Sequence, residues 1–147
     1  MDIAKCLAVI DLLCARGFPT AHGGTEHGES GPGYHIAVLR TSGDFWEDDG
    51  TGREETAAQF EADRDGLAER LTGRWGPPQR FSLRSAFGRV MEGEAVEEPW
   101  AELSEHVPDI HLWQTPGADR WVALGVSCGY EELPIRLLGI VTETDPP

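Results

Sequence analysis

Apolar residues recur at helical spacing in two stretches of the chain. Between residues 3 and 16 the intervals are four, three and four, at Ile3, Leu7, Ile10 and Cys14. Gly17 and Pro19 follow this stretch, so we expect the helix to end there. A longer helix is predicted from Thr51, because Thr51 and Glu54 match a capping box that precedes a second apolar series, Ala57, Phe60, Leu67 and Leu71.

Alternating or continuous apolar runs predict strands in much of the remainder. We expect five of them, over residues 34–41, 80–87, 109–115, 121–127 and 134–142. The last three read as an antiparallel meander. Pro99, followed by Trp100 and Leu103, predicts a short helix of about two turns. The glycine-rich segment 17–33 is expected to be a loop.

This order of elements predicts an α+β fold. We expect a mostly antiparallel sheet of about five strands, packed with two main helices and one short helix. No repeat or long linker divides residues 1–147, which indicates a single domain. Small bacterial immunity proteins, which neutralise toxins, often have this general architecture, but an architecture does not fix a function.

The predicted meander is apolar on both faces, although an antiparallel sheet usually leaves one face wet. A regular hairpin through 116–120 would place His111 opposite Gly125. One face would then hold Ile110, Leu112, Val122, Leu124, Val126, Ile135, Leu137 and Val141. The other would hold Trp113, Trp121, Ala123, Leu138 and Ile140 beside His111, Gly125 and Arg136. Four covers are open for this second face: the short helix with Trp100 and Leu103, one of the long helices, a partner or second copy of the chain (a homodimer), or a ligand in a pocket of His111, Trp113 and Trp121.

Composition indicates the cellular compartment and excludes some classes of binding partner. Twelve basic and 26 acidic residues give a net charge of −14, which argues against binding to nucleic acid or to an anionic membrane. The N-terminus lacks a signal-peptide pattern, no apolar run reaches the length of a membrane span, and three cysteines cannot all pair within one chain. We therefore expect a cytoplasmic protein. A single lysine and no asparagine indicate a GC-rich, bacterial coding sequence, which would account for part of the acidity.

Charge is segregated along the chain. Five arginines and no acidic residue fall between Arg70 and Met91, six glutamates follow up to Glu105, and another acidic block spans Asp44 to Glu55. Internal ion pairing is one explanation, with each exposed pair contributing at most about 1 kcal/mol. The alternative is an acidic surface that docks a basic protein, with Trp46 as an aromatic anchor. The predicted partner-binding residues are Asp44, Trp46, Glu47, Asp48, Asp49, Glu94, Glu97 and Glu98.

Motifs for catalysis or metal binding are weak. His22, His27 and His35 suggest a metal or ligand loop, but their spacing matches no helical zinc motif and glycines surround them. The chain has no phosphate-binding loop sequence. A Ser127–His111 pair is conceivable on neighbouring strands, yet no nucleophile-elbow sequence surrounds Ser127.

These observations favour a non-catalytic acidic interaction protein, of the inhibitor or immunity type, that docks a basic protein partner without a cofactor. The alternative is a small ligand- or metal-binding domain or enzyme. Its site would use His22, His27 and His35, or the pocket of His111, Trp113 and Trp121.

Overall fold

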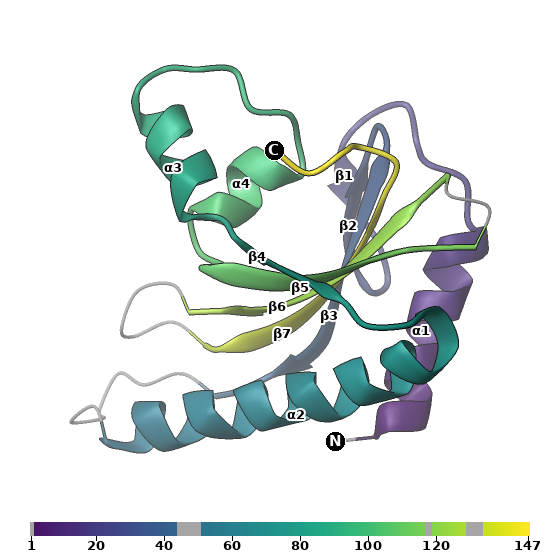
Figure 1. Cartoon of the computed structure of the whole chain (residues 1–147), viewed down its shortest axis with the longest axis vertical. Helices are drawn as coiled ribbons and strands as arrows, with labels where there is room; N and C mark the ends of the chain where they lie inside the picture. Colours follow the sequence, from purple (N-terminus) through teal and green to yellow (C-terminus); the bar gives the residue numbers. More distant parts are fainter. Residues whose placement is uncertain (1, 44–50, 117–118, 129–133) are drawn as a thin grey trace.

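The protein folds around one seven-stranded antiparallel sheet with helices on both faces (Figure 1). The computed structural model describes residues 2–43, 51–116, 119–128 and 134–147. The strand order is β1-β2-β3-β7-β6-β5-β4. The strands are β1 (Gly23–Gly24), β2 (Gly28–Gly31), β3 (Tyr34–Thr41), β4 (Gln79–Ser82), β5 (Asp109–Gln114), β6 (Trp121–Ser127) and β7 (Arg136–Thr142). The α+β class and the meander β5-β6-β7 are as predicted.

Two long helices cover one face of the sheet. Helix α1 (Ile3–Ala15) begins at Asp2, whose carboxylate accepts a hydrogen bond from the backbone N–H of Lys5 (3.1 Å). Helix α2 (Thr51–Trp75) starts within one residue of the position that the capping-box pattern predicts. Both helices bury their apolar stripes against the sheet, with Ile10, Leu13, Leu67, Leu71, Trp113, Val122 and Leu124 in one core cluster.

A short helix, α4 (Trp100–Ser104), covers the opposite face. Trp100 and Leu103 are fully buried there, in a second cluster with Ile110, Leu112, Ala123, Leu138 and Ile140. Of the covers that the sequence left open for this face, the structure shows the short helix with Trp100 and Leu103.

The predicted register of the β5–β6 hairpin is wrong by one residue. His111 lies opposite Leu124, and Gly125 lies opposite Ile110. Because side chains alternate between faces, a shift of one residue moves a whole strand's side chains to the other face. Ile110 and Leu112 accordingly lie under α4, whereas Val122 and Leu124 face α1 and α2.

The glycine-rich segment 17–33 contains two strands, so the prediction of a loop is wrong there. A Pro32-Gly33 turn, with Gly33 at φ 84°, joins β2 to β3. Gly28 pairs with Ala37 of β3, and a Cβ at Gly28 would collide with the carbonyl oxygen of Ile36. Glycine at this position permits the two backbones to approach, which strand propensity does not anticipate.

The predicted strand 80–87 is also wrong beyond its start. β4 ends at Ser82, and helix α3 (Arg84–Met91) follows. The hydroxyl of Ser82 accepts a hydrogen bond from the backbone N–H of Arg84 (3.3 Å), and Leu83 and Ala86 are buried at helical spacing. Phe87, which the alternation placed on a buried face, is 38% exposed.

Among the described residues, no helix is both long enough and apolar enough to cross a membrane.

Candidate functional site

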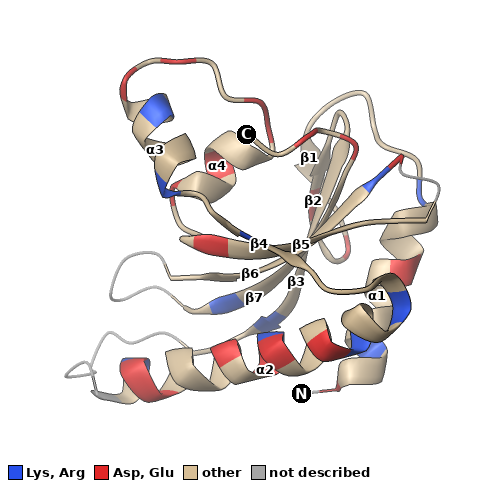
Figure 2. Ribbon diagram, viewed as in Figure 1, with Lys and Arg blue, Asp and Glu red and all other residues tan. Residues whose placement is uncertain are grey.

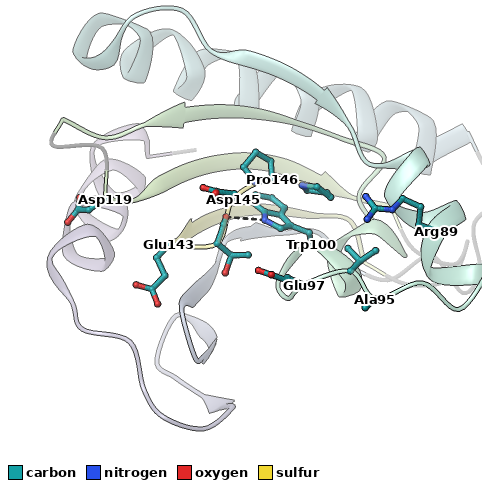
Figure 3. Close-up of a pocket in the computed structure, with 11 residues that line it drawn as sticks. Arg89, Ala95, Glu97, Trp100, Asp119, Glu143, Asp145 and Pro146 are labelled. Carbon is teal, nitrogen blue, oxygen red and sulfur yellow. Dashed lines mark hydrogen bonds between the residues drawn. The ribbon is translucent and has the colours of Figure 1, made fainter.

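An open acidic hollow of about 740 Å³ lies beside α4. Four carboxylates from three separate segments line it: Glu97 before α4, Asp119 between β5 and β6, and Glu143 and Asp145 after β7. Figure 3 shows Arg89 at one end of the pocket, Asp119 at the other, and Glu97, Glu143 and Asp145 between them. We call this hollow the acidic pocket.

Two buried or half-buried tryptophans hold the C-terminal segment in place along this pocket. The indole Nε1 of Trp100 donates to the carbonyl oxygen of Thr144 (3.2 Å), drawn as a dashed line in Figure 3. The indole Nε1 of Trp121 donates to Oδ1 of Asp145 (3.1 Å). These two bonds fix the C-terminal segment against α4 and β6, so its carboxylates have defined positions.

The acidic pocket carries an excess of negative charge. Arg89 is the basic side chain among its described lining residues, and Arg89 already pairs with Glu94 (2.9 Å). Figure 2 shows the acidic positions of the connection after α3 and of the C-terminal segment near α4. A cationic group entering the pocket would therefore meet carboxylates that Arg89 does not neutralise.

The predicted partner-binding residues fall into two sets. Asp44, Trp46, Glu47, Asp48 and Asp49 lie outside the described residues. Glu97 lines the acidic pocket, Glu94 pairs with Arg89 at its edge, and Glu98 is exposed. Oε2 of Glu98 accepts a hydrogen bond from the backbone N–H of Glu102 (3.1 Å) at the start of α4.

Some of the segregated charges form ion pairs within the protein, as the explanation by internal pairing predicts. Arg74 pairs with Asp11 of α1 (2.7 Å), and Arg89 pairs with Glu94 (2.9 Å). These pairs are exposed, so each contributes little to stability.

The predicted histidine loop does not form a metal centre in the described structure. His22 contacts Glu29 (Nε2–Oε2 3.2 Å), whereas His27 lies 3.9 Å from Glu26. His35 is buried, with Nδ1 bonded to Oγ of Ser30 (2.6 Å) and Nε2 near the carbonyl oxygen of Arg16 (3.3 Å). Within residues 2–43, 51–116, 119–128 and 134–147, no three His, Cys, Asp or Glu side chains are grouped to hold a metal ion.

The predicted pocket of His111, Trp113 and Trp121 is divided by the sheet. His111 and Trp113 face the long helices, with ring centroids 6.4 Å apart, while Trp121 packs against the cluster under α4. The one-residue register error is the reason, because it had placed all three on one face. Nδ1 of His111 is buried without a hydrogen-bond partner in the described structure, and burial lowers the pKa of His111.

Ser127 has a histidine partner, but it is His106 and not the predicted His111. Nδ1 of His106 lies 2.8 Å from Oγ of Ser127, and the carbonyl oxygen of His106 accepts from the backbone N–H of Cys128 (3.0 Å). Burial lowers the pKa of His106. Sequence reasoning missed this pair because its members are 21 residues apart on different elements and no motif links them.

His106 and Ser127 line a second hollow of about 200 Å³, which we call the α4 cavity. It lies between α4 and the sheet, and Glu29, Glu102 and Arg136 also contribute to its wall. Its apolar surface comes from Ile36, Val38, Leu103 and Leu138.

The three cysteines are unpaired thiols, with Cys6 buried and Cys128 exposed. Partial desolvation of the thiol raises the pKa of Cys128 although the residue is exposed, and burial raises the pKa of Cys14 to about 11. Thiols with raised pKa values are poorly ionised near neutral pH and therefore weak nucleophiles.

No protein-family model, curated protein or solved structure matches this chain.

Proposed function

We propose that this is a non-catalytic acidic interaction protein, of the inhibitor or immunity type, which docks a basic protein partner at the acidic pocket. The observation that carries the proposal is the convergence of Glu97, Asp119, Glu143 and Asp145 on one open hollow. The net charge of −14 adds a long-range field that attracts a cationic partner and speeds encounter.

The pocket suits an arginine side chain of such a partner. A guanidinium presents several N–H donors in a plane and bonds carboxylates with two parallel hydrogen bonds. Carboxylates in the pocket come from different segments, so a partner is recognised only where these segments are folded together.

The test compares two variants of equal net charge. One is E97Q/D119N/E143Q/D145N in the acidic pocket, and the other is E54Q/E55Q/E61Q/E69Q on the exposed surface of α2. Each removes four negative charges, so each changes −14 to −10. Asp145→Asn keeps the oxygen that accepts from Trp121.

Binding of a short arginine-rich peptide is measured by calorimetry at low and at physiological salt. The pocket variant should lose about tenfold or more in affinity, and the α2 variant clearly less. Equal losses in the two variants would show that net charge, and not the pocket, attracts the peptide, and would contradict the proposed site. A native partner captured from cell extract should likewise bind the wild type and the α2 variant, and should be lost with the pocket variant.

A further inference from the structure

The α4 cavity has two chemically different ends and an apolar floor. Glu29 on β2 and Glu102 on α4 form one end, and Arg136 on β7 and Ser127 on β6 contribute to the other. Ile36, Val38 and Leu138 form apolar surface on the sheet side. None of the cavity's described lining residues belongs to the acidic pocket.

The acidic end holds two carboxyl groups from different elements. Glu29 also lies 3.2 Å from Nε2 of His22. Burial raises the pKa of Glu102, and so do the negative charges of Glu29 and Glu98 and a hydrogen bond with Glu29. Two carboxylates this close repel each other, so a positive charge placed between them would favour ionisation of both.

The opposite end offers groups that bind an anion. Arg136 and Ser127 are register partners on β7 and β6, so both side chains lie on the face of the sheet that α4 covers. The His106 imidazole touches the Ser127 hydroxyl (2.8 Å). When Nδ1 of His106 is the donor in this contact, the hydroxyl hydrogen of Ser127 is left to donate to a ligand.

The register sets the span between the two ends. Glu29 pairs with Ile36 of β3, and Arg136 pairs with Thr41 of the same strand. These positions are 41 − 36 = 5 residues apart with an irregularity between them, which corresponds to roughly 13–16 Å along β3. β2 and β7 lie on opposite sides of β3, which adds about 10 Å across the strands, so the α-carbons of Glu29 and Arg136 are about 16–19 Å apart. Glutamate and arginine side chains extending into this span leave room for a short aliphatic chain.

We propose that the α4 cavity binds a small aliphatic molecule with a protonated amine at one end and a carboxylate at the other. The amine lies between Glu29 and Glu102, the methylene groups rest on Ile36, Val38 and Leu138, and the carboxylate accepts from Arg136 and Ser127. This site is separate from the acidic pocket, so the two proposals succeed or fail independently.

The test is a calorimetric titration of the full chain with three probes of one chain length: 6-aminohexanoate, hexylamine and hexanoate. The amino-carboxylate should bind about tenfold or more tightly than either single-headed probe, because only it engages both ends. Glu102→Gln and Arg136→Gln should each weaken its binding by about tenfold. The matched controls Glu61→Gln and Arg70→Gln change the same charges on exposed positions of α2, across the sheet, and should bind as the wild type does.

Val38→Phe provides a variant that alters no charge. It should fill part of the cavity and reduce binding, while circular dichroism and the urea midpoint report whether it remains folded. The proposal is overturned if 6-aminohexanoate gives no heat at millimolar concentration, if hexylamine binds as tightly, or if the control variants weaken binding as much as the cavity variants.

Discussion

Arg120 links the end of α1 to the connection between β5 and β6, and its removal should be costly. Its Nη1 donates to the carbonyl oxygens of Leu13 (2.9 Å) and Arg16 (2.8 Å), residues more than 100 positions earlier. The guanidinium also lies over the ring of Phe18, 4.1 Å from its centroid. These carbonyls end α1, where unpaired C=O groups and the helix dipole favour a cation.

The expected magnitude follows from these contacts. A hydrogen bond from a charged donor is worth about 1.5–3 kcal/mol, and a cation–π contact near the surface about 0.5–1 kcal/mol. Because one nitrogen makes both hydrogen bonds and water replaces part of them in the variant, Arg120→Met should lower the free energy of unfolding by about 2–4 kcal/mol. Arg120→Lys keeps the charge but not the planar group over Phe18, and should lose about half as much.

Urea unfolding followed by tryptophan fluorescence measures this effect. With a slope of about 2 kcal/mol per molar urea, the midpoint for Arg120→Met should fall by roughly 1–2 M. Arg70→Met, at an exposed position of α2, is the control for loss of one positive charge. If Arg120→Met unfolds within about 0.5 kcal/mol of this control, the guanidinium does not fasten α1, and the reasoning is refuted.

Three further substitutions test the packing and the buried histidines. Gly125→Ala should lower the free energy of unfolding by about 1–3 kcal/mol, because a β-carbon there would lie 2.7 Å from Cγ1 of Val107. The control Gly88→Ala, whose β-carbon would have nothing within 4 Å, should be neutral or slightly stabilising. Equal urea midpoints for the two variants would contradict the predicted clash. His111→Leu removes the buried Nδ1 that has no partner in the described structure, so stability should change by less than about 1 kcal/mol or rise, and a loss above about 2 kcal/mol would show that the imidazole is needed. Burial lowers the pKa of His35 below 6.5 in the folded protein. At a pH between the folded-state and unfolded-state pKa values, the unfolded chain therefore binds a proton that the folded protein does not. The contribution of the neutral His35 to stability is present above pH 6.5 and is lost as the pH falls through the folded-state pKa. Urea titrations across this window should show a smaller acid-induced loss for His35→Gln than for wild type, and an unchanged loss would contradict the assignment.

Local signals in the sequence predict α1 and α2, because residues near each helix end mark where the helix begins or ends. The spacing of Ile3 to Cys14, followed by Gly17, predicts α1 to within one residue. Thr51 marks the start of α2. Such signals act within one or two turns of backbone, so they need no tertiary contact to be read.

Edge strands and register depended on contacts between distant segments. β2 exists because Gly28 can lie against the β3 backbone, which no propensity indicates. A regular hairpin predicts that His111 and Trp121 lie on one face of the sheet, and the one-residue difference in register places them on opposite faces. The Pro32-Gly33 pair is the sequence signal for the turn of the β2–β3 hairpin.

The sequence by itself determined the α+β class, the two long helices, the meander and the acidic balance of the chain, because these follow from periodicity and composition. It also indicated that Trp100 and Leu103 suit the second sheet face. Only the tertiary structure decided which charges meet. The carboxylates of the acidic pocket come from segments up to 48 residues apart, from Glu97 to Asp145, and Glu29 of β2 and Glu102 of α4 line one cavity. Local patterns do not encode such meetings, since they arise from strand order and from the way that two layers pack on each other.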